Sequence, residues 1–254
     1  MSEESASDAA QAEKKEEKSN PLLGMLDKTF ESVRKFLADQ KLLKFTDELT
    51  YMFMRKGIDM LKSTFIPMQI DGIENVPDFK PAIICSIVEQ PVELFLAAAI
   101  TPRKVHFMVP PKMFEMPGLK PLLEAIGAYK STTSQDDMEP VQRTMEFLNE
   151  NKDLVAMIPI DNGDREKLDK SISAILKFAA GIPCPLVPFA STSLKKYKLG
   201  KAIKIKIAEP IDVNPKIKRD QRHEMASQLV DTLLAMKAEL ETKDDESTQA
   251  PQQA

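Results

Sequence analysis

The chain has 254 residues, of which 43% are hydrophobic and 29% are charged. This length and composition are typical of one sizeable globular domain with tails. The longest apolar run falls well short of the ~18–20 residues that span a bilayer, and the first twenty residues lack the apolar stretch of a secretory signal. We therefore expect a cytoplasmic protein without a transmembrane helix.

The formal net charge of −4 comes from the two ends of the chain. Residues 1–20 carry six acids and three lysines, and residues 239–254 carry five acids and one lysine, which leaves 31 basic and 28 acidic residues between them. A body with this small positive excess can approach an anionic lipid surface, but the excess is too small to predict nucleic-acid binding.

The N-terminal quarter predicts a disordered tail followed by two helices. Residues 1–20 consist mainly of Ala, Ser, Glu and Lys, a composition typical of disorder. Residues 21–65 have apolar residues at helical spacing, and the second helix, over residues 46–63, combines a Met- and Phe-rich face with basic residues. This helix either docks on the inner face of a membrane or packs on the protein's own core, and the sequence leaves both open.

Residues 66–240 alternate short apolar segments with helices, which is typical of an α/β domain. Buried strands are expected at residues 82–86, 105–109, 154–160 and 185–190. Isoleucine alternates with lysine at residues 202–207, which predicts a strand with one wet face and leaves a position at the sheet edge open.

The helices of this domain are predicted from apolar residues at helical spacing. One begins after Asp136 and Asp137 and has Val141, Met145 and Leu148 on one face. Two later helices carry the same kind of apolar face: Ile172, Ile175, Leu176 and Ala179, and then Met225, Leu229, Leu233, Met236 and Leu240. Residues 241–254, rich in Gln, Asp and Glu, are expected to form a second disordered tail.

Two features that suggest a metal site have simpler explanations. Cys85 and Cys184 lie far apart in apolar runs, which favours buried thiols over a disulfide or a metal site. The segment Asp161-Asn162-Gly163-Asp164 lacks the length and the closing glutamate of a calcium loop, so a polar turn is expected. We expect neither a metal nor another cofactor.

Several short segments, taken in order, resemble the PlsC-like glycerolipid acyltransferases of the lysophosphatidate acyltransferase type. The matching segments are residues 71–77 with 81–86, then 112–114, 117–128, 181–188 and 207–211. The resemblance covers residues 66–240. It implies a twisted, mostly parallel sheet flanked by helices and preceded by an amphipathic helical pair, with an acyl thioester and a glycerol phosphate meeting above the sheet.

The catalytic pair of that family, in the motif S-N-H-x4-D, is missing here. Aligning Ser86 with the motif's serine places Val88 at the histidine and Glu93 at the aspartate. Valine cannot take the proton from an acceptor hydroxyl. The possible substitute bases are Glu89 and Glu93, provided that an apolar setting raises their pKa.

Neither histidine of the chain replaces the missing base by position. His106 lies in an expected strand and His223 in the last helix, and neither has a carboxylate five residues on. Both are expected to be structural or surface residues.

The family's second motif, F-P-E-G-T-R-S, holds the phosphate of the acceptor. Here the corresponding segment reads Ile158-Pro159-Ile160-Asp161-Asn162-Gly163-Asp164-Arg165, so an isoleucine and a glycine replace the glutamate and the arginine. Two aspartates at this place would repel a phosphate dianion. The remaining candidates for substrate binding are Lys112, Lys130, Asp161, Asn162 and Arg165.

Loss of the base, of the orienting group and of the phosphate clamp together predicts a catalytically degenerate relative. Such a pseudoenzyme would bind a lipid, an acyl chain or a partner protein. One alternative is an active acyltransferase that acylates a lysophospholipid or glycerol phosphate with Glu89 or Glu93 as base. Another is a peripheral membrane or assembly module that acts through residues 46–63.

Overall fold

A computed structural model of the chain describes residues 67–116, 119–131, 137–150, 152–182, 184–197 and 201–249. The tail and the helical pair predicted for residues 1–65 lie outside the described residues, so the helix over residues 46–63 stays a prediction. Within the part of the chain that the structure describes, none of the helices combines the length and the apolar composition that crossing a bilayer requires.

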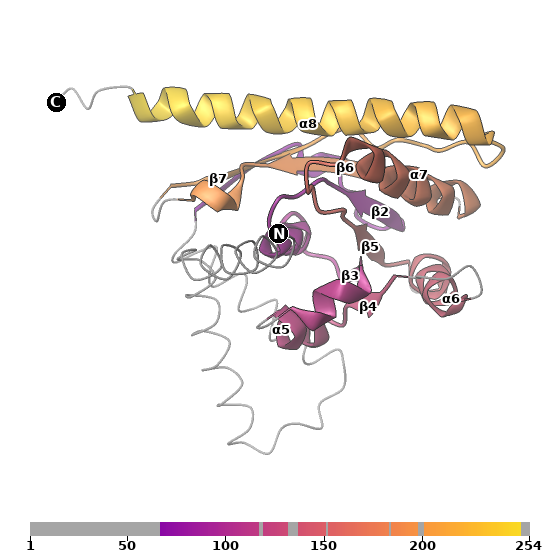
Figure 1. The fold of residues 1–254 in the computed structure, drawn as a ribbon. Helices are drawn as coiled ribbons and strands as arrows, with labels where there is room; N and C mark the ends of the chain where they lie inside the picture. The colour runs from indigo at the N-terminus through magenta and orange to yellow at the C-terminus, as the bar shows by residue number, and fades with distance from the viewer. Residues whose placement is uncertain are drawn as a thin grey trace, which may run out of the picture. The chain divides into compact units, whose positions relative to one another are not determined.

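Among the described residues, seven strands form one sheet in the order β1-β7-β6-β2-β5-β3-β4 (Figure 1). The strands are β1 (Met68–Asp71), β2 (Ala82–Cys85), β3 (Val105–Val109), β4 (Tyr129–Lys130), β5 (Leu154–Met157), β6 (Leu186–Ser191) and β7 (Ile203–Ile207). The strands from β6 to β4 are parallel, β7 is antiparallel to β6, and β1 is parallel to β7. The predicted α/β class with a mostly parallel sheet is confirmed.

The burial of the strands explains why their sequences differ. Every residue of β2, β5 and β6 is buried, because helices or other segments cover both faces, and these strands accordingly read as unbroken apolar runs. In β7 the isoleucines are buried and the lysines are half-buried, as the alternation predicted. The alternative that β7 lies at the edge of the sheet is wrong, because β1 pairs with its outer side.

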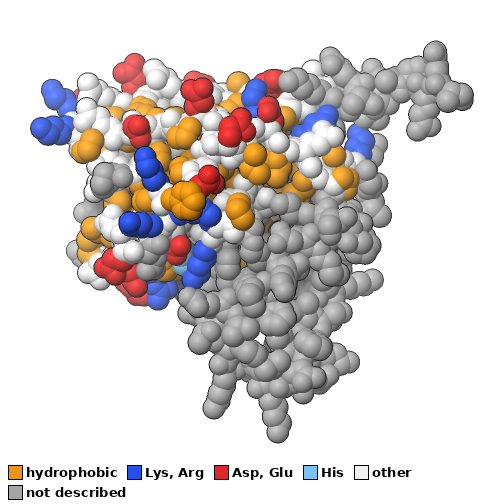
Figure 2. Space-filling view, turned by 180° about the vertical axis from the view of Figure 1, so that it is seen from behind, with side chains coloured by type: hydrophobic (Ala, Val, Ile, Leu, Met, Phe, Trp, Pro, Cys, Tyr) orange, Lys and Arg blue, Asp and Glu red, His pale blue; other side chains and the backbone are white. Residues whose placement is uncertain are grey.

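The helices are α4 (Leu96–Ala99), α5 (Leu119–Ala125), α6 (Glu139–Met145), α7 (Arg165–Gly181) and α8 (Arg219–Gln249). Helices α7 and α8 lie together on one face of the sheet, and α5 lies on the opposite side (Figure 1). The apolar residues predicted for α7, from Ile172 to Ala179, are all buried in the core beneath α7 and α8. Acidic, basic and hydrophobic side chains are interspersed on the described part of the molecule seen in Figure 2, consistent with the small net charge of the body.

Helix α8 extends further than its apolar stripe. Leu229, Leu233, Met236 and Leu240 are buried, as predicted, and Met225 is partly buried. The helix continues through Gln249, whereas the sequence predicts a disordered tail from residue 241. At about 1.5 Å per residue, this helix is about 46 Å long.

The buried face of α6 differs from the predicted one. Pro140 and Thr144 of α6 are buried, and so is Leu148 in the π-helical turn η4 (Glu146–Glu150) that continues it, whereas Met145 is 43% exposed, so its predicted place on the buried face is wrong. The Thr144 hydroxyl lies 2.7 Å from both the Tyr129 hydroxyl and the Pro140 carbonyl oxygen, which satisfies its hydrogen bonds inside the protein. A polar side chain with such partners can take an interior position that a pattern of apolar residues does not reveal.

The two cysteines are confirmed as free, buried thiols. Burial raises the pKa of the Cys85 thiol to about 12 and that of the Cys184 thiol to about 11. Both are therefore protonated and chemically inert at neutral pH.

Candidate functional site at the carboxyl edge of the sheet

The two segments aligned with the acyltransferase motifs, and a third segment that contacts one of them, follow the carboxyl ends of neighbouring parallel strands. Residues 86–93 follow β2, residues 158–165 follow β5, and residues 192–194 follow β6. In open α/β sheets, ligands bind in the crevice outside these strand ends, near the strand at which the direction of the chain connections reverses. Strand β2 lies between β6 and β5, so its carboxyl end is the place to examine for a site.

Val88, at the position of the family's histidine, is a buried structural residue. Its side chain is 1% exposed. Its backbone N–H donates to Pro159 O at 3.2 Å, and its carbonyl oxygen accepts from the Asp161 N–H at 2.7 Å. These bonds extend the pairing between the segments that follow β2 and β5. The position therefore offers neither a proton acceptor nor exposure to a substrate.

Glu93, at the position of the family's aspartate, is held by backbone donors from two segments. One carboxylate oxygen accepts the N–H of Glu89 at 2.9 Å, and the other accepts the N–H of Leu194 at 2.7 Å. Leu194 begins η5 (Leu194–Lys196), and Glu93 lies in η2 (Pro91–Phe95), so the carboxylate joins these two short helices. Burial raises the pKa of Glu93, although these donors and the nearby Lys237 oppose the shift.

The Glu89 carboxylate accepts hydrogen bonds from two side chains. One carboxylate oxygen accepts from Lys237 Nζ at 2.7 Å, and the other accepts from Ser193 Oγ at 3.0 Å. Burial by itself would raise the pKa of Glu89, but the hydrogen bond and the charge of Lys237, together with the Ser193 hydroxyl, hold it below its ordinary value. Lys237 belongs to α8 and is 8% exposed. We call Glu89, Glu93, Ser193 and Lys237 the edge cluster.

The sequence did not predict two members of the edge cluster. Lys237 lies within the apolar stripe of α8, where a charged residue is unusual, and this misplaced charge was a usable signal. Ser193 caps η5 by accepting from the Lys195 N–H at 3.3 Å, which is an ordinary role that gave no sign of its contact with Glu89.

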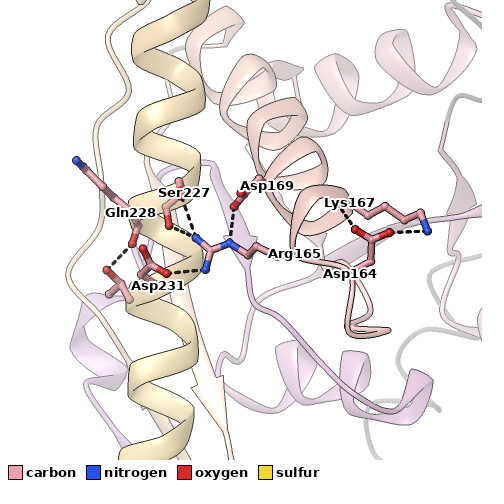
Figure 3. Close-up of polar contacts among 8 residues, drawn as sticks. Asp164, Arg165, Lys167, Asp169, Ser227, Gln228 and Asp231 are labelled. Carbon is pink, nitrogen blue, oxygen red and sulfur yellow. Dashed lines mark hydrogen bonds and ion pairs between the residues drawn. The ribbon is translucent and has the colours of Figure 1, made fainter.

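The loop after β5 forms a turn and a helix cap. Asp161 accepts from the Gly163 N–H at 2.8 Å, and Gly163 has φ 79°, a conformation that favours glycine. Asp164 is the N-cap of α7: it accepts from the Lys167 N–H at 3.1 Å and pairs with Lys167 Nζ at 2.7 Å (Figure 3). Lys167 accordingly lowers the pKa of Asp164. Asn162 lies exposed in the turn.

Arg165 points from the start of α7 toward α8, and not into the loop (Figure 3). Its guanidinium donates to Asp169 at 2.9 Å, to Asp231 at 2.6 Å and to the hydroxyl and carbonyl oxygens of Ser227 at 2.9 Å. The bonds to Asp231 and Ser227 connect α7 to α8, and the bond to Asp169 lies within α7. The remodelling that would bring Arg165 to a phosphate is not present.

Lys112 follows the carboxyl end of β3, and Lys130 is the last residue of β4. Lys112 is exposed in η3 (Pro111–Glu115), and the Lys130 ammonium lies 5.6 Å from the centre of the Phe114 ring in the same short helix. Both lysines therefore lie at η3. In the strand order, η3 follows β3, which is separated from the edge cluster by β5.

The two histidines lie away from the carboxyl edge. His106 is the second residue of β3, where it stacks on Phe147 with a ring separation of 3.6 Å and contacts Asp153 at 2.9 Å. Burial lowers its pKa, although Asp153 opposes the shift. His223 is exposed on α8. Across the described ranges, no group of three or more His, Cys, Asp or Glu side chains is arranged to hold a metal ion.

No protein-family model matches the chain, and no curated protein matches its sequence. Among solved structures, the fold is similar to the crystal structure of the 1-acyl-sn-glycerophosphate (LPA) acyltransferase PlsC from Thermotoga maritima, with a TM-score of 0.55 and 15% sequence identity. The similarity covers 94% of this chain and 100% of that chain. At this identity the likeness shows the fold alone: the chain shares an α/β architecture with a PlsC acyltransferase.

Proposed function

We propose that the chain is a catalytically degenerate relative of the PlsC-like acyltransferases, a pseudoenzyme that binds a lipid or an acyl chain without transferring it. The observation that carries the proposal is the pair of residues at the two catalytic positions of the family's motif. Where the family places a histidine and an aspartate, the chain has a buried valine and a carboxylate that accepts two backbone N–H groups. Valine has no lone pair to take the proton of an acceptor hydroxyl, and Glu93 is 1% exposed with both oxygens accepting backbone N–H groups, so neither residue is placed to act as a general base.

A retained acyl transfer with a substitute base is the second candidate. Its support is the pKa of Glu93, which burial raises toward the range of catalytic carboxyls. Against it, both oxygens of Glu93 are engaged by backbone donors, and Glu89 has a lowered pKa and an ion pair with Lys237. Both carboxylates are therefore better suited to holding segments together than to taking a proton.

Among the substrate-binding residues expected from the sequence, Lys112 and Lys130 are exposed: Lys112 follows β3, and Lys130 is the last residue of β4. We keep both as candidates for contact with a bound ligand. Asp161 and Asn162 form a turn beside an acidic cap, which is unfavourable for a phosphate. Arg165 is engaged between α7 and α8, so we do not assign it to a ligand.

The proposal is tested by mass spectrometry of lipid that copurifies with the protein, run beside a radiolabelled acyl-transfer assay with lysophosphatidate and long-chain acyl thioesters. Copurifying lipid, or binding of added lysolipid, without turnover supports the proposal. Protein that has been delipidated and then binds no lysolipid or acyl-chain ligand contradicts it.

Turnover that survives stringent repurification would favour the second candidate. In that case either Glu89→Gln or Glu93→Gln should abolish the transfer, whereas Glu166→Gln, which changes an exposed carboxylate on α7, should not. Transfer that persists in both edge-cluster variants would exclude these carboxylates as the base.

A further inference from the structure

The ion pair between Lys237 and Glu89 lies at the end of the sheet where a ligand is expected. After β2 the chain crosses to β3, and after β5 it crosses in the opposite direction along the strand order to β6, so the reversal lies between β2, which Glu89 follows, and β5. The crevice of an open α/β sheet forms beside such a reversal. Lys237 reaches this place from α8, although 148 residues separate it from Glu89 in the sequence.

The two partners of the pair are unequally buried. The Lys237 side chain is 10% exposed, and that of Glu89 is 38% exposed. A buried ammonium needs an anion beside it, because leaving it unpaired is strongly unfavourable. The carboxylate, in contrast, can turn toward water at a small cost. The pair therefore has a fixed cation and an anion that another anion can replace.

The remaining contacts of the edge cluster permit this exchange. Glu93 keeps its two backbone donors whether or not Glu89 is paired, so η2 and η5 stay joined. The Ser193 hydroxyl, which donates to Glu89 at 3.0 Å, lies next to the same place and can donate to an incoming oxygen instead. An anion at Lys237 would thus find one cation and one hydroxyl donor already in position.

We propose that Lys237 is the anchor for the anionic head group of a single-chain lipid, and that Glu89 occupies this anchor until the phosphate or carboxylate of the lipid replaces it. The inference rests on the proposed function, since it names the head-group chemistry and the anchoring residue of the same site. The acyl chain distinguishes such a ligand from a free phosphate, because burial of its methylenes adds to the ionic contact.

The test is isothermal titration calorimetry on the full chain with four probes: 18:1 lysophosphatidate, oleate, uncharged monoolein and glycerol 3-phosphate. Glu89→Gln should bind the anionic lipids about tenfold more tightly than the wild type, because the competing carboxylate is gone. Lys237→Met should bind them about tenfold more weakly. Monoolein should bind both variants and the wild type equally. The two variants are expected to change the affinity in opposite directions, whereas damage to the fold would weaken binding in both.

The matched control is the ion pair between the half-buried Lys206 and the exposed Glu239, which also involves α8 and has a distance of 2.8 Å. Lys206→Met and Glu239→Gln should leave all four affinities unchanged. If Glu89→Gln does not fold, Glu89→Asp keeps the charge on a shorter side chain and should show a smaller gain in affinity. Preference for lysophosphatidate or for oleate identifies the head group as a phosphate or a carboxylate.

Three results would overturn the inference while leaving the proposed function intact: unchanged affinities in the variants of Glu89 and Lys237, losses in both, or equal effects on monoolein. Tight binding of glycerol 3-phosphate alone would overturn the assignment to a lipid. Absence of binding by every probe, to the wild type and to Glu89→Gln alike, would remove both the inference and the proposed function.

Discussion

Replacing Glu93 tests whether its carboxylate has a structural or a catalytic role. This side chain is 1% exposed, and its two oxygens accept the N–H groups of Glu89 at 2.9 Å and of Leu194 at 2.7 Å. Glu93→Ala leaves both donors without a partner inside the protein. Glu93→Gln keeps the shape and one acceptor oxygen, but its amide NH₂ faces the second donor.

The expected loss in the free energy of unfolding follows from these two donors. A buried donor that loses its acceptor costs about 1–3 kcal/mol, so Glu93→Ala loses about 2–6 kcal/mol from this source. Removing a carboxylate whose pKa is raised by burial returns part of that loss, because the charged form is disfavoured inside the protein. We expect Glu93→Ala to lower the free energy of unfolding by about 2–4 kcal/mol, and Glu93→Gln by about half as much.

Urea unfolding at neutral pH measures both values, with the slope compared between variants to confirm the same unfolding transition. Glu166→Ala is the control, because it removes an exposed carboxylate that pairs with Lys170, and it should leave stability almost unchanged. A Glu93→Gln variant as stable as the wild type would refute the reasoning. It would mean that the carboxylate is not a structural acceptor, and it would strengthen the case for Glu93 as a base.

Three further predictions concern other residues. Burial lowers the pKa of His106 below its ordinary 6.5, so the stability that its neutral ring contributes is present above pH 6.5 and is lost as the pH falls through the folded pKa. An NMR titration should give a midpoint below 6.5, and His106→Gln should make the free energy of unfolding less dependent on pH between 7.5 and 5.5; an unchanged dependence would contradict this. Cys85 and Cys184 should not react with a thiol reagent at pH 8 in the native protein and should both react in urea, whereas rapid native labelling would show that they are accessible. Arg165→Ala should lower stability slightly, since it removes contacts between α7 and α8, and should leave lysophosphatidate binding unchanged in calorimetry; weaker binding would return Arg165 to the ligand site.

The four strands that the sequence predicted as buried share one property. In β2, β3, β5 and β6 almost every residue is buried, so each strand is an apolar run bounded by polar residues or prolines. The missed strands are β1 and β4, which contain four and two residues and have no such run. Because β1 was missed, the place of β7 inside the sheet could not be predicted from its alternating sequence.

The buried face of α6 shows a different limit. The spacing of Val141, Met145 and Leu148 predicted an apolar face, but the hydroxyl of Thr144 is paired inside the protein and Met145 turns outward. A partner on another element, Tyr129 of β4, decides this choice. Periodicity along one helix cannot include that partner.

The sequence by itself determined which chemical groups the carboxyl edge lacks. No histidine precedes His106, and aligning the sequence with the PlsC-like motifs places a valine at the histidine and a glycine at the clamp arginine. The tertiary structure alone decided the state of the carboxylates that remain. Glu89 and Glu93 have opposite pKa shifts. Lys237 of α8 lies against Glu89 and lowers its pKa, whereas Glu93 is buried beside the backbone of η5, and this burial raises its pKa. The pKa of a carboxylate depends on the charges and donors packed around it, and here these come from segments more than one hundred residues away in the chain.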